Sequence, residues 1–353
     1  MRIFVVVIAV AVIFTSFSAL AEEEQMIPDT DGNAKKVGED KKGVISLIFE
    51  NDLFTGTDYG YTNGARLSYT SSEEGMPAYI RKASSYLPLL KEEGKKRISV
   101  AVGQNIFTPR DIQATEFIEN DFLYAGWLYG SLEILSDQDE KFDNVGLTIG
   151  MVGPSSKAEQ TQKYIHQVKG VIMPKGWNNQ LKDEPGINFT YERKWRKIFV
   201  SELFGMGFDV MPHVGANLGN VNTSTATGAT FRLGYDLPAD YGPPRIHPNL
   251  SGSDFFIPTR KFSGYLFSTF EISAVARDIF LDGNTFKDSH SIEKRSFVKN
   301  LQLGGTLIYK DMRFSYTHVI STQKFKGQQD KYTQFGGITF SYEPVANLTS
   351  QKI

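Results

Sequence analysis

Cysteine is absent from the 353 residues of this chain, so the sequence can form no disulfide framework, no thiolate zinc site and no cysteine nucleophile. A large charge excess is also absent. The formal net charge is −2, and no electrostatic feature points to nucleic acid as a partner. No G-x-S-x-G motif occurs, which argues against an α/β-hydrolase. Beyond the amino terminus no run of about 18 apolar residues is present, so no later segment resembles a transmembrane helix.

The amino terminus has the layout of a secretory signal peptide. Arg2 supplies a positive charge, residues 3–14 are apolar, and residues 19–21 form an A-x-A cleavage signal before an acidic run. We therefore predict a signal peptide over residues 1–21 and a polar periplasmic lead-in over residues 22–42. The alternative is an uncleaved anchor.

The rest of the chain contains many strand-like segments in which apolar side chains recur with a period of two. Met312, Phe314 and Tyr316, for example, alternate with polar residues. A soluble antiparallel sandwich shows similar alternation, but the signal peptide and an even number of segments favour a barrel in the outer membrane of a Gram-negative bacterium. We predict an all-β transmembrane antiparallel β-barrel of about twelve strands over residues 43–342, with short helices in connecting segments and a tail over residues 343–353. The predicted strands lie near residues 43–50, 61–72, 96–105, 123–135, 142–152, 185–196, 206–218, 226–236, 262–276, 297–309, 311–321 and 332–342.

The connections alternate between the two ends of such a barrel. If the chain enters from the periplasm, the first, third and fifth connections are extracellular. Short periplasmic turns are expected near residues 136–141, 197–205 and 310. The periplasmic connection over residues 73–95 is long and partly helical in pattern, and the connection over residues 237–261 is long and rich in proline.

The first connection, within residues 50–64 (ENDLFTGTDYGYTNG), is dense in oxygen donors. Carboxylate, amide and hydroxyl oxygens are the ligands that a hard cation such as calcium prefers, and the donors here are Asn51, Asp52, Thr55, Thr57, Asp58 and Thr62. The alternative is a polar hairpin that turns at the Asn-Gly pair of residues 63–64.

The fifth connection contains a predicted helix over residues 154–170, which Ser155 or Ser156 caps and a glycine ends. Tyr164, Ile165 and Val168 form an apolar stripe, and His166 projects away from it. The competing interpretation is a solvated surface histidine.

Several blocks, in this order along the chain, resemble the outer-membrane lipid A 3′-O-deacylase family known as LpxR. The resemblance extends over about residues 43–342. Its motifs are ENDLFTGTDYGYTNG (50–64), NIFTP (105–109), YAGWLY (124–129), the His166 segment leading to GWNNQLKDEP (176–185), LGNV (218–221) and DLPADYGPPRI (236–246).

The resemblance implies a twelve-stranded barrel that removes the 3′-linked acyloxyacyl group of lipid A in a calcium-dependent reaction. It implies that Asn51, Asp52, Thr62 and His166 are the catalytic residues and that Asp52 is the metal ligand. The implied partners are lipid A or lipopolysaccharide as substrate and the surrounding outer-membrane lipid, with a monomeric chain. Phosphate recognition does not carry over, because family members often read D-R-P before Y-A-G where this chain has no arginine, and Arg110 is a weak substitute in the same loop.

The chemistry of ester hydrolysis suits these residue types. A histidine can take the proton of an attacking water, and a cation held by Asp52 can stabilise the oxyanion by several kcal/mol. Asn51 can donate a hydrogen bond to the same oxygen, and Thr62 can position the water or the ester. The odd-numbered connections place these residues, together with Thr108, at one rim of the barrel. Two alternatives remain: a barrel phospholipase or esterase with the same machinery, and a non-catalytic small barrel.

Overall fold

The computed structural model describes residues 43–55, 60–90, 94–246, 252–258 and 260–344. The chain divides into two compact units, Met1–Glu39 and Asp40–Ile353, and every described residue belongs to the second. The predicted signal peptide, the lead-in and most of the tail lie outside the described residues, so their assignments stay predictions.

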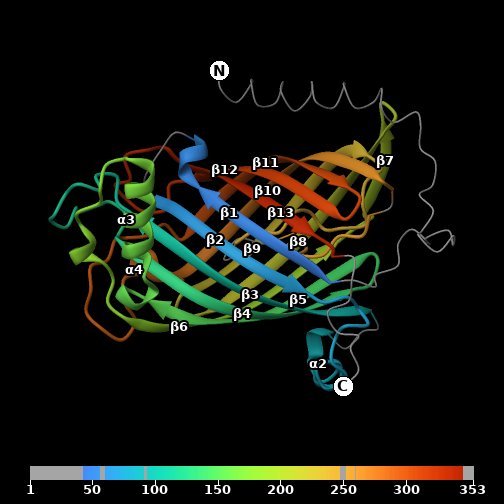
Figure 1. The fold of residues 1–353 in the computed structure, drawn as a ribbon, viewed down its shortest axis with the longest axis horizontal. Coiled ribbons are helices and arrows are strands. Elements are labelled where there is room, and N and C mark those ends of the chain that lie inside the picture. The colour runs from blue at the N-terminus through green and yellow to red at the C-terminus, as the bar shows by residue number, and fades with distance from the viewer. Residues whose placement is uncertain (1–42, 56–59, 91–93, 247–251, 259, 345–353) are drawn as a thin grey trace. The chain divides into compact units, whose positions relative to one another are not determined.

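The described residues form one antiparallel sheet that closes into a barrel (Figure 1). Apart from β6 and β7, strands that are consecutive in the chain are neighbours in the sheet, and the first strand pairs with the last. The strands are β1 (Val44–Asn51), β2 (Gly60–Thr70), β3 (Lys95–Thr108), β4 (Ala125–Asp137), β5 (Lys141–Val152), β6 (Glu184–Trp195), β7 (Phe199–Leu203), β8 (Met206–Gly219), β9 (Asn222–Tyr235), β10 (Phe262–Asp278), β11 (Phe297–Tyr309), β12 (Met312–Thr322) and β13 (Tyr332–Tyr342).

The twelve-stranded barrel is confirmed, with one extra strand, β7. It lies where the sequence predicts a turn over residues 197–205. β6 and β7 both pair with β8, β6 along residues 213–219 and β7 along residues 206–210, so β7 continues the line of β6 after a short break. Lys197 in that break has a φ of 64°. The hairpin to β8 then turns at Phe204 and Gly205, whose φ values of 54° and 73° suit a two-residue turn of type I′.

Side chains alternate between the lumen and the outer surface of the barrel. On β1 the exposed residues are Ile45, Leu47 and Phe49, whereas Ser46 and Glu50 point inward and are buried. An apolar outer face and a polar inner face are what a transmembrane barrel requires, because lipid meets one and protein or water the other.

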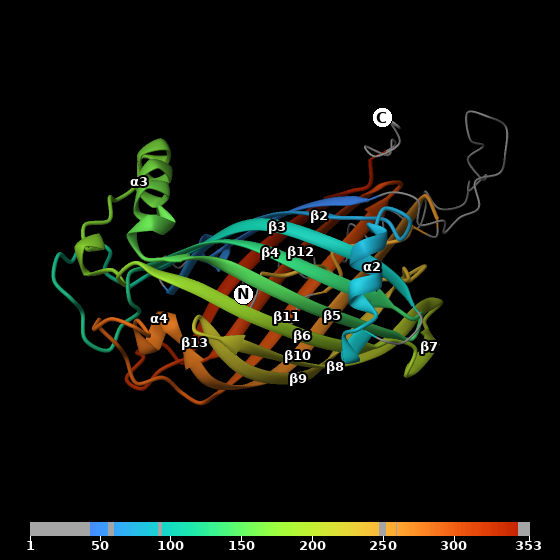
Figure 2. The ribbon, with the colours of Figure 1, turned by 90° about the horizontal axis from the view of Figure 1, so that it is seen from below.

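Short helices gather at the two ends of the barrel (Figures 1 and 2). We call one end the α2 rim, which carries α2 (Ala78–Ser84) and η2 (Pro88–Leu90) in the predicted partly helical connection. The other, the α3 rim, carries η1 (Asp52–Thr55), η3 (Pro154–Ser156), α3 (Ala158–Lys169), η4 (Trp177–Asn179) and α4 (Ile279–Asp282). Among the described residues, no helix has the length and apolar character needed to cross a membrane.

The connection between β9 and β10 fills the lumen. We call its described residues, 237–246 and 252–258, the luminal segment. It enters from the α2 rim, and Tyr241, Ile246, Phe255 and Phe256 on it are buried. The sequence predicts only a long proline-rich connection here. The fold takes it inside because its aromatic side chains pack against inward-facing residues such as Phe142.

Buried ion pairs fasten the luminal segment to strands from both halves of the barrel. Arg66 on β2 contacts Asp254 at 2.8 Å, and Arg245 contacts Glu50 on β1 at 2.7 Å. Asp240 lies between two further arginines, with Arg232 at 2.5 Å as one of them. Buried pairs add little net stability by themselves, but the removal of one partner costs about 3–5 kcal/mol because the other is left buried and charged. These pairs therefore fix the position of the segment.

Candidate active site on the outer wall of the barrel

The first part of the site is the end of β1. Asn51 follows Ile45, Leu47 and Phe49 on the outward-facing side of the strand, yet it is only 7% exposed, whereas those three face the surroundings. Asp52 begins η1 directly after it and is fully buried. A polar pair is thus buried on the face of the wall that is otherwise apolar.

Two hydroxyl residues join this pair to the neighbouring strands. The side-chain amide of Asn51 donates to the carbonyl oxygen of Thr62 at 2.7 Å, and the Thr62 hydroxyl lies 2.5 Å from the hydroxyl of Thr108 on β3. The register of β2 on β3 slips between Tyr61 and Asn63, so Thr62 is the bulged residue, and bulges commonly re-aim a side chain. The bulge thus connects the ends of β1, β2 and β3 through a hydrogen-bonded series that we call the hydroxyl chain: Asn51, Thr62 and Thr108.

Helix α3 packs on the outside of the same wall. The side-chain amide of Gln104 on β3 donates to the carbonyl oxygen of Ser156 at 2.6 Å, just before the helix. Ile106, two residues further on the same outward face, lies in a buried cluster with Ala158 and Trp177. Gly126 on β4 lies under the helix, and a methyl group there would stand 2.2 Å from the Ala158 side chain. Because Thr108 is the next outward residue of β3 after Ile106, α3 lies beside the hydroxyl chain.

The face that α3 buries is its polar face. Gln162 and His166 are buried on the same face as Ala158, which packs on the wall, and the indole nitrogen of Trp177 donates to the Gln162 side chain at 2.8 Å. The residues of the predicted apolar stripe point away, with Tyr164 and Val168 each 68% exposed. His166 is therefore on the side of the helix that the sequence predicts, but the interpretation as a solvated surface histidine is wrong, since it is 6% exposed.

The ends of the helix follow the sequence only in part. Gly170 ends it in the left-handed conformation with a φ of 65°, as predicted. The predicted serine cap is right only in part, because Lys157 occupies the cap position while the Ser156 hydroxyl accepts from the backbone amide of Ala158, the first helical residue, at 3.4 Å. Ser155 is bound instead by the carboxylate of Asp183, which accepts from its backbone amide at 2.6 Å and from its hydroxyl at 2.9 Å.

The ring of His166 has one nitrogen fixed. Nδ1 lies 2.5 Å from the carbonyl oxygen of Ile172. A carbonyl oxygen only accepts, so Nδ1 carries the hydrogen and donates. In the neutral ring, Nε2 is then the nitrogen with a lone pair, which is the arrangement that a general base needs.

A model of the outer-membrane protein LpxR matches residues 6–344. The chain belongs to the LpxR family. The solved structure of LpxR from Salmonella typhimurium is 18% identical, covers 85% of this chain and 99% of its own, and superposes with a TM-score of 0.69. The β domain of the Bordetella autotransporter BrkA is 8% identical, covers 86% of this chain and 99% of its own, and reaches a TM-score of 0.42, which adds nothing to the assignment. No curated protein matches the chain.

The family match confirms the assignment that the sequence motifs suggested, and it places the chain in the outer membrane of a Gram-negative bacterium. Of the predicted site residues, the structure brings Asn51, Thr62 and Thr108 into direct contact, with Asp52 adjacent to Asn51 in the chain. His166 reaches the same side of the wall on α3.

The donor chemistry of this LpxR-family site fits a hard cation in part. Asp52 offers a buried carboxylate, and Asn51, whose amide nitrogen donates to Thr62, has an amide oxygen of the kind that a hard cation binds. Among the described residues no group of three or more His, Asp or Glu side chains is arranged to hold a metal. Two predicted oxygen donors, Thr57 and Asp58, lie outside the described residues.

Arg110, the weak substitute for the family's phosphate-binding residues, is half exposed. It forms an ion pair with Asp330 in the connection between β12 and β13. Its side chain therefore already has a carboxylate partner, and phosphate recognition by Arg110 would require that pair to open.

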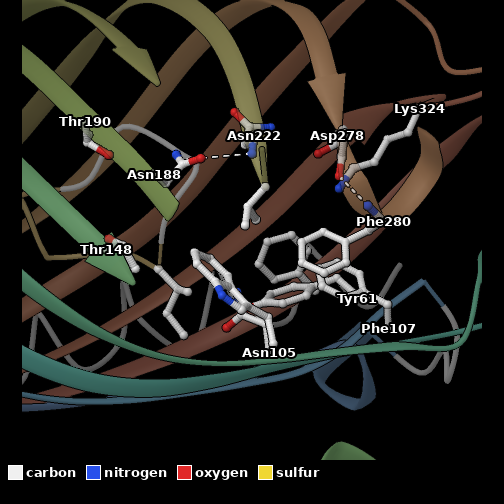
Figure 3. Close-up of a pocket in the computed structure, with 15 residues that line it drawn as sticks. Tyr61, Asn105, Phe107, Thr148, Asn188, Thr190, Asn222, Asp278, Phe280 and Lys324 are labelled. Atoms are coloured by element: carbon white, nitrogen blue, oxygen red, sulfur yellow. Dashed lines mark hydrogen bonds between the residues drawn. The ribbon is translucent and has the colours of Figure 1, made fainter. Parts of the chain in front are cut away.

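A second polar site lies in the lumen at the α3 rim and was not predicted from the sequence (Figure 3). It is a cavity of about 80 Å³ on the other side of the wall from the hydroxyl chain, because Asn105 and Phe107 line it while Ile106 and Thr108 alternate with them. Burial lowers the pKa of the Lys324 amine in it. Polar inward residues line every barrel, so the sequence carries no signal that marks this cavity. It is lined by Tyr61, Asn105, Phe107, Trp127, Thr148, Asn188, Thr190, Val221, Asn222, Ile246, Asp278, Phe280, Ser321, Lys324 and Phe335.

Proposed function

We propose that this protein is an outer-membrane lipid A deacylase that hydrolyses the 3′-linked acyloxyacyl ester, with the α3 rim on the extracellular side. Family membership supports a lipid substrate. The observation that carries the proposal is the burial of Asn51 and Thr108 on the outward faces of β1 and β3, where the exposed outward residues, such as Leu47 and Val102, are apolar. A water-soluble substrate would be served by a site in the lumen or in a loop, whereas an ester held in a membrane leaflet meets the outer wall.

The reaction that these residues support is hydrolysis by water. His166 takes a proton from the water at Nε2 while the water oxygen forms a bond to the ester carbonyl carbon, and the carbonyl oxygen becomes an oxyanion. The bond between that carbon and the sugar oxygen then breaks, and the proton passes from His166 to the sugar oxygen. The products are the free fatty acid and the sugar hydroxyl.

Asn51 and Thr62 have supporting roles. An amide nitrogen has two hydrogens, so Asn51 can keep its bond to the Thr62 carbonyl oxygen and donate the second hydrogen to the oxyanion. The loss of such a donor costs about 10²–10³-fold in turnover in comparable sites. The Thr62 hydroxyl, held by Thr108, positions the water or the ester. A threonine nucleophile would need an adjacent base, so water is the better attacker.

The proposed cofactor is a calcium ion, with Asp52 as ligand and the Asn51 amide oxygen as a second candidate. When bound, a divalent cation supplies charge stabilisation to the oxyanion without any proton transfer. The substrate, lipid A or lipopolysaccharide, and the neighbouring lipid are the proposed partners of a monomeric chain.

Mass spectrometry of lipid A from cells that produce this chain tests the proposal. Cells with the wild-type chain should lose the mass of the acyloxyacyl group, and cells with His166→Ala should retain it. The same preparations, assayed on glycerophospholipid vesicles with calcium, distinguish the esterase alternative, which releases fatty acid from the phospholipid and leaves lipid A intact. A folded protein that acts on neither substrate would be the non-catalytic barrel.

A further inference from the structure

Helix α3 has three faces rather than two. At about 100° per residue, Ala158, Gln162 and His166 form the buried face toward the wall. Tyr164, Ile165 and Val168 lie to one side of it, and we call them the apolar flank. Gln160, Lys163 and Gln167 lie to the other side, and we call them the polar flank.

This arrangement is the reverse of a helix on a soluble protein, which buries its apolar face and exposes its polar one. Here the buried face includes the polar side chains of Gln162 and His166, while Tyr164 and Val168 are exposed. The chain just after the helix is apolar and exposed as well, at Val171, Ile172 and Met173. Exposed apolar side chains gathered in one part of a protein surface mark an interaction site.

The direction of α3 fixes where the two flanks point. In both views the helix runs across the long direction of the barrel at the α3 rim (Figures 1 and 2). Its buried face is turned to the wall, so its flanks point in opposite directions along the barrel, one toward the membrane-spanning belt and the other away from it.

The apolar belt of the wall reaches the edge of the helix. Val102 on β3 and Leu128 on β4 are exposed outward residues of that belt. Two positions further along the same faces are Gln104 and Gly126, which lie beneath η3 and α3. Two residues of strand span about 7 Å, so the helix begins where the lipid-facing surface ends.

We propose that α3 is an interfacial helix, whose apolar flank rests on the acyl-chain layer of the leaflet at the α3 rim. The occupant is membrane lipid because the flank is continuous with a surface that already faces lipid. An amphipathic helix in the plane of the interface buries its apolar side about 5–10 Å into the boundary between headgroups and acyl chains. Its polar flank meets the headgroups and water, and its third face holds His166 at the depth of the lipid ester region.

Spin labelling tests this inference without any enzymatic assay, so its failure is distinct from failure of the proposed function. The chain has no cysteine, and each single-cysteine variant therefore carries one label. We would compare Val168→Cys on the apolar flank with Gln167→Cys on the polar flank, and use Leu128→Cys on the belt as the lipid reference. The labelled proteins would be reconstituted in phosphatidylethanolamine and phosphatidylglycerol vesicles, and heat-modifiable gel mobility would confirm folding.

The measurement is the ratio of label collision with oxygen, which concentrates in lipid, to collision with a water-soluble nickel chelate. The label at position 168 should give a ratio close to that at position 128 and well above that at position 167. Equal ratios at positions 167 and 168 would show that the flank is in water and would overturn the proposal. Dipolar broadening at position 168, which is abolished by dilution with unlabelled protein, would assign the flank to a second copy of the chain and would overturn it as well.

Discussion

Gly126→Ala should uncouple α3 from the barrel wall. A Cβ at this position stands 2.2 Å from both the Ala158 methyl group and the Ser156 hydroxyl, and ordinary contact begins near 3.4 Å. The wall and the helix must therefore separate by more than 1 Å. His166 lies on the same buried face of α3 as Ala158, so a shift of the helix displaces the His166 side chain as well. A misplacement of about 1 Å can cost about 10²-fold in rate, equivalent to about 2.7 kcal/mol in the activation barrier.

Gly130→Ala is the matched control, since it lies on the same outward face of β4 and its added Cβ meets only a backbone oxygen at 3.7 Å. The assay is the initial rate of fatty-acid release from lipid A vesicles with calcium, for proteins whose gel mobility shows a folded barrel. We expect turnover to fall about 10²-fold in Gly126→Ala and to stay unchanged in Gly130→Ala. Wild-type turnover in a folded Gly126→Ala protein would refute the dependence of catalysis on the docking of α3.

Four further predictions concern the site and the luminal segment. His166→Ala and His166→Gln should each lower turnover by about 10²–10⁴-fold with the barrel intact, and wild-type turnover in either would place the base elsewhere. Asn51→Ala should cost about 10²–10³-fold in turnover without a shift in its pH dependence, because it removes an oxyanion donor and not the base. A chelator should abolish hydrolysis and calcium should restore it better than zinc, whereas full activity in excess chelator would remove Asp52 from its metal role. Arg245→Met should lower the free energy of unfolding in urea by about 3–5 kcal/mol, because it leaves the Glu50 carboxylate buried without this partner, and an unchanged midpoint would contradict that reasoning.

The strands could be predicted from the sequence because the membrane imposes a period of two on every outward face. Met312, Phe314 and Tyr316, for example, alternate with buried polar residues on β12, and the predicted segments agree with the observed strands. The break that creates β7 could not be predicted, since it depends on the left-handed backbone of Lys197 and not on hydrophobicity.

The luminal segment was missed for a different reason. Its proline-rich sequence is that of a surface connection, and its partners are remote in the chain: Arg66 and Asp254 are 188 residues apart. The pattern of apolar and polar residues within a short segment contains no information about a contact with a residue so far away in the chain.

The sequence predicts which residues form the site, but it does not predict that they are buried on the outer wall of the barrel. A period of two puts Asn51 on a lipid-exposed face, whereas in the structure it is buried where η1 turns back over the neighbouring strands β2 and β13. For α3, the apolar stripe of Tyr164 and Val168 suggests the packed side, whereas tertiary hydrogen bonds of Gln104 and Gln162 select the opposite side.

The ion pairs of the luminal segment also constrain the order in which the barrel can assemble. Their partners on β1 and β2 are synthesised first, the segment itself follows β9, and Arg313 on β12, which contacts Asp240 at 3.4 Å, comes near the end. β1 meets β13 only at closure, so the segment cannot make all of these pairs before the strands on both sides of that seam are in place. The segment thus links the two sides of the seam at which the barrel closes, and a variant that cannot seat it should lose this link as well as the filling of the lumen.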